Sequence, residues 1–438
     1  MPKVNRKRGT QKKAQGVGTG LGSRPATDDE NSTGDNWSTV SVASDDSSWC
    51  ESASVADEQE IEDTTEQENF EDRLAECIEG IASKSGPQRN KFLEGLRKAF
   101  SKKYIAEFLD KRKETVSDSL LRCVRKGKSD EVVLAAICLS LLAVQLGEEL
   151  SPQYPNIQAV LTTVMTDKSA SVKARAECAT TLAMCCFLAT DDFEDTQTIM
   201  SSLEDIFSQC YRKGDGTMPQ MNPDLSLLHN RCLAAWSLLV TTSPPFFVEK
   251  LAMTHISLLG DLLHSSDTEL RITAGEAIAL LYDMSRCIDE NFGGDDEATQ
   301  RLCVQLKELS TESTKHMAKK DRRTQRSCFR DILRTVEAGE VPEATIRMGI
   351  ESLVVEGWQL KKHYDAFCQV LGSGINIHLQ ENVMLRDFFN LGPPLPVGAK
   401  PTQKLSKVER NFHNNVANKA RTKARARSRD KRSVVIGF

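Results

Sequence analysis

The chain has 438 residues, a net charge of −5 and 6% aromatic residues, and its charges are strongly segregated along its length. Residues 1–24 carry seven cations and no acid, residues 25–72 carry sixteen acids and no cation, and residues 400–438 carry twelve Lys or Arg against two acids. The scattered cysteines lack zinc-ligand spacing, no apolar signal sequence opens the chain, and the apolar run 132–144 is shorter than the ~20 residues that span a bilayer. We therefore expect an intracellular protein with reduced thiols and no membrane segment.

The first 70 residues are poor in apolar side chains, first basic and then acidic. This composition predicts a disordered segment, because it cannot bury enough apolar surface to offset the entropy of ordering. The glycines at 16, 18, 20 and 22 follow no predicted strand, so they do not fit a dinucleotide-binding fingerprint.

From about residue 71 the chain is predicted to be helical almost throughout, with an internal repeat. Four segments share small residues at the start and an apolar end, and their starts are separated by 40, 56 and 42 residues. Removing residues 211–226, a polar stretch with Gly and Pro, restores a period of 40 residues. Such a period, built from helix pairs, is typical of armadillo or HEAT repeats. The aligned segments are 136–142, 176–182, 232–238 and 274–280.

The local pattern predicts where the repeat helices begin and end. The stretch Val132 to Val144 is apolar on nearly all sides, as expected for an inner helix covered by its neighbours. The preceding stretch has one apolar stripe and ends at Gly127, which suits an outer helix. We expect Ser129 to cap the inner helix and Ser266, with Glu269, to form a capping box.

The pattern changes after about residue 291. A basic helix is predicted at 315–336, followed by an apolar segment, a possible short β-element near 346–355 and a Gly-Pro-Pro stop at 392–394. The expected fold class is all-α. We predict an armadillo/HEAT-like helical solenoid at 71–310, a smaller, mostly helical C-terminal cap domain at 311–398 docked on its end, and a basic tail at 399–438.

The tail is the first candidate site, because a cation stands at nearly every second position between residues 419 and 432. Steps of two residues rotate about 200° around a helix, so these cations would lie on opposite faces. That arrangement suits a channel walled by phosphate, and we predict RNA contact by a tail that is helical when bound. A nuclear-import signal and a solvated tail remain alternatives. The predicted RNA-binding residues are Lys419, Arg421, Lys423, Arg425, Arg427, Arg429, Lys431 and Arg432.

A second basic cluster lies in the predicted helix 315–336. Its members at 322, 326 and 330 follow i, i+4 spacing and would share one helix face. The alternatives are additional phosphate contacts or a solvated face paired with carboxylates such as Asp331 or Glu337. The cluster comprises Lys319, Lys320, Arg322, Arg323, Arg326 and Arg330.

No catalytic, metal or cofactor motif is evident, so we expect a protein that is not an enzyme. His363 and His378 are interpreted as structural residues, and Trp236 and Trp358 as core residues. The cations around Cys328 favour a lowered thiol pKa, although a redox role is not the preferred interpretation. The concave surface of the solenoid is the remaining candidate, as a groove for partner proteins.

The chain resembles the interferon-related developmental regulator family over roughly residues 70 to 432. In the repeat region the resemblance rests on segments 126–131, 189–192 and 271–276. Towards the C-terminus it rests on 321–330, 364–367, 370–374, 391–394, 419–425 and 429–432.

The resemblance implies a non-enzymatic regulator with an armadillo-type fold. Family members are described as binding translationally inactive ribosomes, with the C-terminal segment in RNA-lined channels where mRNA or tRNA would lie, and as transcriptional co-regulators linked to deacetylase complexes. We therefore expect a translational repressor whose partners are rRNA and ribosomal proteins. The alternative is a nuclear scaffold that recruits transcription factors and histone deacetylase complexes. We expect cytoplasmic and nuclear localisation, and neither membrane nor small-molecule substrate.

Overall fold

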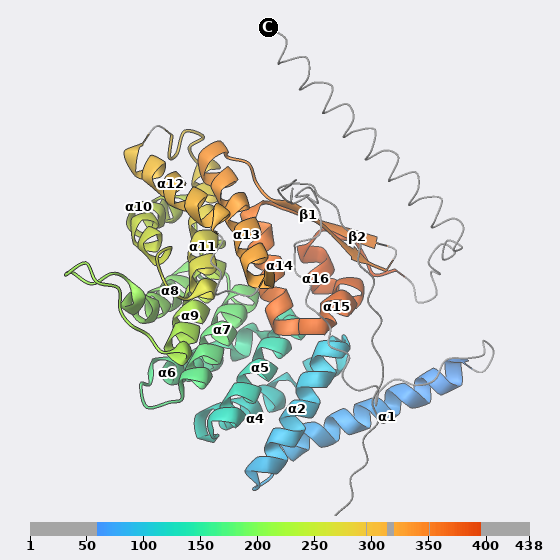
Figure 1. The fold of residues 1–438 in the computed structure, drawn as a ribbon. Coiled ribbons are helices and arrows are strands. Elements are labelled where there is room, and N and C mark those ends of the chain that lie inside the picture. Colours follow the sequence, from blue (N-terminus) through green and yellow to red (C-terminus); the bar gives the residue numbers. More distant parts are fainter. Residues whose placement is uncertain (1–58, 295, 313–318, 350, 396–438) are drawn as a thin grey trace, which may run out of the picture. The chain divides into compact units, whose positions relative to one another are not determined.

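The computed structural model describes residues 59–294, 296–312, 319–349 and 351–395, and all of them lie in one unit, Ser38–Phe438. Within that unit the helices form two rows (Figure 1). Each helix of the inner row packs against the next inner helix and against one helix of the outer row. The inner row is α2 (Gly86–Lys102), α5 (Ser129–Leu146), α7 (Val172–Ala189), α9 (Pro223–Val240), α11 (Thr268–Arg286) and α13 (Lys319–Ala338). The outer row is α1 (Gln59–Gly80), α4 (Lys113–Lys126), α6 (Tyr154–Thr166), α8 (Phe193–Phe207), α10 (Pro245–Leu262) and α12 (Glu297–Thr311).

The two packed rows of helices confirm the predicted helical solenoid, and burial on nearly all sides distinguishes its inner helix α5. In α5, 13 of 18 residues are buried, so the helix has no face left for solvent. The stretch Ser129–Thr166 is apolar enough to cross a membrane by length and composition, but 78% of its apolar window is already covered inside the fold. All four repeated sequence segments fall within α5, α7, α9 and α11. The predicted insertion is shorter than expected, because 223–226 already belongs to α9.

Both predicted serine caps are wrong. Helix α5 begins at Ser129 itself, and the Ser129 hydroxyl lies 2.6 Å from that of Ser171, the N-cap of α7. This bond links the starts of two neighbouring inner helices. Helix α11 is capped by Asp267, whose carboxylate accepts a hydrogen bond of 3.0 Å from the backbone N–H of Leu270. A carboxylate there also suits the positive end of the helix dipole.

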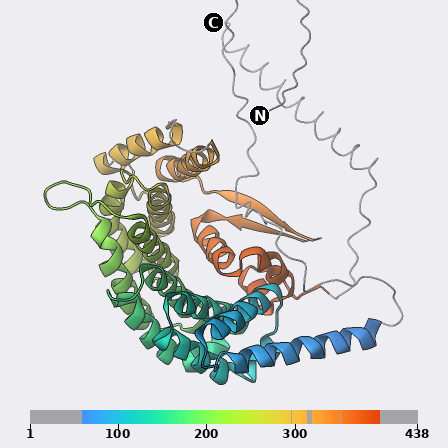
Figure 2. The same ribbon diagram turned by 60° about the horizontal axis from the view of Figure 1, so that its bottom comes forward.

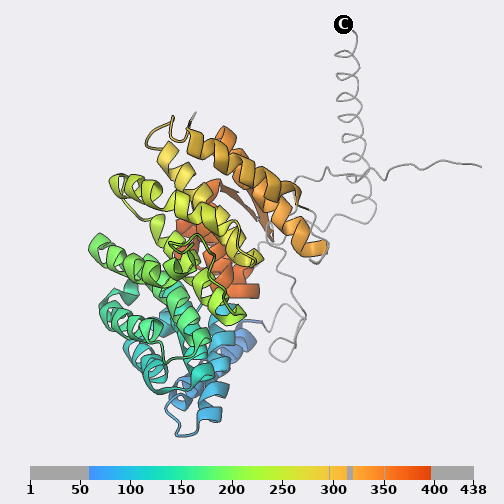
Figure 3. The ribbon, with the colours of Figure 1, turned by 60° about the vertical axis from the view of Figure 1, so that its left-hand side comes forward.

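The residues after α13 lie along the concave side of the inner row (Figures 2 and 3). They form an antiparallel hairpin, β1 (Glu343–Met348) and β2 (Glu351–Glu356), which confirms the predicted short β-element. Helix α14 (Gly357–Leu371) then packs on α5, α9 and α11, α15 (Ile375–Glu381) on α2, and α16 (Val383–Phe388) on α5. We had expected this C-terminal segment, residues 343–395, to dock on the end of the solenoid. It crosses several repeats along the concave side instead. The predicted boundary between residues 310 and 311 stays a prediction.

Polar side chains of this C-terminal segment satisfy carbonyl groups at the ends of the inner helices. The last carbonyls of a helix have no partner inside that helix, so burial requires donors from elsewhere. The donors are His378 Nε2 to Phe100 O at 3.0 Å, Asn382 Nδ2 to Val144 O at 2.8 Å, and Gln359 Nε2 to Thr241 O at 3.0 Å. Over α2 and α5, the concave face is thus covered by the chain's own C-terminal segment.

Candidate RNA-binding elements and a polar groove on the concave face

The eight predicted tail cations, 419–432, lie outside the described residues, which end at Leu395. The described residues nevertheless show how the segment that precedes the tail is held. Arg386 of α16 is 1% exposed and donates two hydrogen bonds, of 2.8 and 3.0 Å, to the carboxylate of Glu351 in β2. It also donates to the carbonyls of Leu379, Gln380, Leu391, Gly392 and Pro393.

This arginine network fixes the chain at residues 391–393, shortly before the predicted tail. The guanidinium has five N–H donors in a rigid fork, and here they are shared among one carboxylate and the carbonyls of successive residues. Gly392 adopts a left-handed φ of +72°, which L side chains rarely take. The Gly-Pro-Pro motif that the sequence marked as a stop is therefore a turn folded around Arg386.

The second predicted basic cluster lies at the start of α13. Its buried stripe, which includes Gln325, Phe329 and Ile332, faces α11 and α12. Arg323 is exposed, whereas Arg322, Arg326 and Arg330 are half-buried beside this stripe. The Nε of Arg322 is buried without a hydrogen-bond partner among the described residues. Side chains of Lys319 and Lys320 lie outside what the structure describes, so the cluster stays a predicted phosphate contact.

Asp331, one of the carboxylates that the alternative interpretation named, is approached by an arginine from outside the cluster. Arg334 lies 3.8 Å from it at i, i+3 spacing, and a pair this accessible contributes little to stability. Deeper in the same junction, Arg271 of α11 donates a hydrogen bond of 3.0 Å to Gln325, which in turn donates one of 2.8 Å to Glu312. These bonds fix α13 against α11 and α12.

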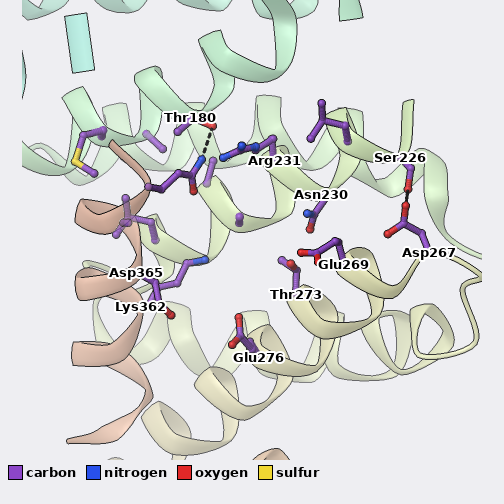
Figure 4. Close-up of a pocket in the computed structure, with 18 of the residues that line it drawn as sticks. Thr180, Ser226, Asn230, Arg231, Asp267, Glu269, Thr273, Glu276, Lys362 and Asp365 are labelled. Carbon is purple, nitrogen blue, oxygen red and sulfur yellow. Dashed lines mark hydrogen bonds between the residues drawn. The ribbon is translucent and has the colours of Figure 1, made fainter. Parts of the chain in front are cut away.

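A polar groove of about 510 Å³ opens between α7, α9, α11 and α14 (Figure 4). It lies on the part of the concave face that α14 borders without covering. Sequence reasoning proposed a concave binding surface but named no residues for it, because these side chains come from four helices far apart in the chain. Its polar lining is Thr180, Ser226, Asn230, Arg231, Asp267, Glu269, Thr273, Glu276, Lys362, Asp365 and Gln369.

Several carboxylates of the groove are engaged by other side chains. Lys361 of α14 donates to Glu276 at 2.8 Å and to Asp365 at 2.5 Å. Burial alone would raise the pKa of Glu276, but the Lys361 ammonium outweighs it and holds this pKa below its usual range. For Asp365 burial prevails and raises the pKa. Asp267 accepts a hydrogen bond from Ser226 across the groove wall, at 2.5 Å.

Two cations of the groove, unlike these carboxylates, have no direct partner among the described residues. Lys362 of α14 and Arg231 of α9 make no hydrogen bond and no ion pair within 4.0 Å to any described residue. Burial lowers the pKa of Lys362 below its usual range. The nearby Glu276 and Asp365 carboxylates oppose this shift without reversing it, and the neighbouring Lys361 adds to it. Arg231 lies near enough to Glu177 to oppose the rise in that carboxyl's pKa, which burial causes. The Oδ1 of Asn230, the residue before Arg231 in α9, is buried without a partner in the described chain.

The prediction for Cys328 is wrong. Burial raises its thiol pKa well above the usual value, and the Glu276 carboxylate, 3.7 Å from its sulfur, raises it further. The cations in its sequence neighbourhood point along other faces of α13, whereas the carboxylate comes from α11. A thiol with a raised pKa is a poor nucleophile, so the half-buried Cys328 is not an activated thiol.

The histidine and tryptophan predictions are confirmed. His363 Nε2 lies 2.8 Å from the Thr241 hydroxyl, and His378 bonds a backbone carbonyl as described above. Burial lowers the pKa of each imidazole to about 4. Trp236 and Trp358 are 1% and 2% exposed. Among the residues that the structure describes, no group of three or more His, Cys, Asp or Glu could hold a metal ion.

Comparison with known proteins places this architecture in one family. The sequence profile described as interferon-related developmental regulator matches residues 36–337, and the interferon-related protein conserved region matches residues 382–433. The chain belongs to the interferon-related developmental regulator family. The predicted resemblance is thereby confirmed, and the second matching region spans both Arg386 and the basic tail.

Curated relatives extend over most of the chain. Interferon-related developmental regulator 1 of Homo sapiens is 41% identical over 376 residues, 85% of this chain and 83% of the relative. Interferon-related developmental regulator 2 of Mus musculus is 39% identical over 383 residues, 86% of both chains. A more distant, uncharacterized protein of Schizosaccharomyces pombe is 24% identical over 40% of this chain and 43% of its own. A solved engineered protein overlays on 60% of this chain and 97% of its own, but its TM-score of 0.39 at 14% identity supports no argument.

Proposed function

We propose that this protein is a non-enzymatic regulator that binds translationally inactive ribosomes and represses translation. Its basic C-terminal tail, as a helix, occupies an RNA-lined channel on the path of mRNA or tRNA. The partners are rRNA and ribosomal proteins, and the protein acts in the cytoplasm while also entering the nucleus. Family membership supports a regulatory role in general, and the features below support this particular form of it.

The observation that carries the proposal is the charge of the tail together with the way the segment that precedes it is held. Twelve cations against two acids in residues 400–438 give a segment that gains most from surrounding phosphate. The turn before it is fastened by Arg386, through Glu351 and the carbonyls of the turn. A tail that must enter one particular channel benefits from a fixed starting point, because less conformational freedom is lost on binding. An import signal needs no such fastening.

The start of α13 supplies a second region for phosphate contact. Arg323 is exposed there, beside the half-buried Arg322, Arg326 and Arg330. Contacts to phosphate from two separated elements would orient the solenoid on the ribosome, since backbone contacts set register and orientation. In this proposal the tail provides most of the affinity and α13 provides orientation.

Sedimentation with ribosomes tests the proposal. Changing Arg421, Arg425 and Arg429 to Glu should abolish co-sedimentation in sucrose gradients. The unchanged protein should bind with a steep dependence on salt, a slope of log K against log salt of roughly −0.7 to −0.9 per phosphate neutralised. The matched control changes Lys3, Arg6 and Arg8 to Glu, the same change in net charge at the other end of the chain, and should leave sedimentation intact.

The same variants separate the alternative, a nuclear co-regulator scaffold for transcription factors and deacetylase complexes. Under that alternative the tail supplies import, so the three Glu substitutions alter nuclear accumulation and leave ribosome sedimentation unchanged. That outcome would remove the ribosome proposal.

A further inference from the structure

The groove bordered by α7, α9, α11 and α14 holds cationic groups that its own walls leave without direct partners. Lys362 and Arg231 both face the cavity in Figure 4, from α14 and α9 respectively. We propose that this groove binds an extended segment of a partner protein, with an acidic side chain placed between Lys362 and Arg231. This site does not depend on the tail or on its RNA.

The anionic partner follows from the way the other charges are engaged. Glu276 and Asp365 are hydrogen-bonded to Lys361, and Asp267 caps α11 while accepting a bond from Ser226. None of these three carboxylates lies within ion-pair distance of Lys362 or Arg231. A carboxylate from outside is therefore the group that completes the charge arrangement at this end of the groove.

Desolvation of Lys362 supports the same conclusion. Burial lowers its pKa, which means that the charged ammonium is held in an environment that does not fully replace its hydration. A carboxylate within about 4 Å favours the charged form and would shift this pKa back upward. Binding of an acid at this place is thus coupled to proton uptake by Lys362, or to retention of its proton at high pH.

Uncharged groups of the groove suit a polypeptide main chain. The Oδ1 of Asn230 is buried and lacks a hydrogen-bond partner among the described residues. A carboxamide offers both an acceptor and two donors, which match the N–H and C=O of an extended strand. The Thr180 hydroxyl already accepts a bond of 3.3 Å from Gln369 and marks the wall opposite.

The same lining argues against the other ligand classes. A phosphate backbone carries a charge at every step and would meet Asp267, Glu269, Glu276 and Asp365, whereas a polypeptide can place a single acidic side chain at the two cations; nucleic acid therefore fits this groove poorly even though it suits the tail. An apolar small molecule would leave these charged groups without solvent or partner. A mixed-charge groove across three repeats is the kind of surface on which solenoid proteins hold peptides.

The test uses the full-length chain that carries the three tail substitutions to Glu, so that the tail does not capture the probe. The probe is a fluorescein-labelled glycine octapeptide with one central glutamate, and its binding is followed by fluorescence anisotropy. We expect saturable binding that Lys362→Met and Arg231→Gln each weaken about tenfold, the loss of one charge-assisted hydrogen bond. Lys250→Met, on the exposed side of α10, should leave it unchanged. Equal binding by all variants, or no binding, would overturn the proposal.

A second measurement needs no groove variant and so does not depend on whether one folds. Amine acetylation of this tail-substituted chain, followed by mass spectrometry, should show Lys362 protected by the glutamate peptide, and Lys250 not protected. Protection of Lys362 by an eight-nucleotide uridine RNA instead of the peptide would contradict a protein partner. So would carbodiimide cross-links, without any peptide, from Lys362 to the acids of residues 28–58, because the occupant would then be the chain's own acidic segment. These results do not bear on the proposed ribosome binding, which the sedimentation experiment tests separately.

Discussion

The inner row of the solenoid and the C-terminal segment that lies on it are held by different forces. Helix α5 is buried on nearly every side by apolar residues, and similar helices repeat along the row. The C-terminal segment is fastened by polar side chains, including Arg386, Lys361 and His378, in addition to its aromatic contacts. Apolar packing tolerates change roughly in proportion to volume, whereas a buried polar group fails when one partner is removed. The segment should therefore be the part that single substitutions detach.

The largest effect is expected at Gly374, where the backbone of the C-terminal segment lies against the end of α2. A Cβ added there would lie 1.7 Å from the backbone oxygen of Ser101 at the end of α2, and that oxygen cannot move without distorting the helix. Gly374→Ala should lower the free energy of unfolding by more than about 4 kcal/mol, measured by urea denaturation. Gly372→Ala is the matched control, with a left-handed φ of +54° but nothing within 4 Å, and should cost about 1 kcal/mol. Equal losses would contradict the close contact.

Removal of the Arg386 guanidinium should have the next largest effect. Arg386→Met leaves the Glu351 carboxylate and several carbonyls without their donor, which costs about 3–5 kcal/mol of unfolding free energy. The exposed Arg347 of the same hairpin provides the control, and its change to Met should cost less than about 0.5 kcal/mol. Arg386→Lys keeps the charge but not the fork and should fall between them. An Arg386→Met protein as stable as the Arg347 variant would show that this network is not needed.

Two adjacent lysines of α14, Lys361 and Lys362, allow a partnered and an unpartnered cation to be compared within a single helix. Lys361→Met leaves Glu276 and Asp365 facing each other without a cation, which should cost about 2–4 kcal/mol. Lys362→Met removes a cation that has no direct partner and should cost less than about 1 kcal/mol. Thermal or urea unfolding of the two variants measures the difference. Similar losses of unfolding free energy would mean that Lys362, like Lys361, has a direct partner in the folded protein.

Acid should loosen the C-terminal segment through His378. Burial lowers its folded-state pKa to about 4, whereas the unfolded value is about 6.5. The unfolded chain therefore binds the proton first. The stabilisation is complete above pH 6.5 and is lost as the pH falls towards 4, by about 2–3 kcal/mol.

His378→Gln keeps a donor for the Phe100 carbonyl and should flatten this pH dependence, measured by urea midpoints between pH 7.5 and pH 4.5. His363, His229 and His255 also have pKa values lowered to about 4, so a shallower dependence remains in the variant. An unchanged slope would show that His378 takes up its proton in the folded protein as well.

The difference between the two regions also explains what could be predicted from sequence. The 40-residue period was readable because apolar burial repeats from helix to helix, so the four aligned segments all fall in inner helices. The fastening of the C-terminal segment was not readable, since its bonds to carbonyl groups of α2, α5 and the end of α9 join residues 118 to 278 positions apart. The cap at Asp267, rather than Ser266, shows how a helix start shifts by one residue when two good capping residues are adjacent.

The candidate sites divide in the same way. The basic tail was evident from its charge alone, whereas Lys362, Arg231 and Asn230 come from α14 and α9 and meet only through the fold. The thiol pKa of Cys328 is likewise raised by burial and by Glu276, 52 positions earlier, which the adjacent cations in the sequence did not indicate.

A cryo-electron-microscopy reconstruction of the protein on ribosomes from quiescent cells tests the central claim most directly. The account predicts continuous density from the turn around Arg386 into a helix over residues 419–432, with rRNA phosphates on more than one side and no mRNA or tRNA in that channel. A reconstruction in which the solenoid is bound while Lys419 to Arg432 make no contact with RNA would contradict it.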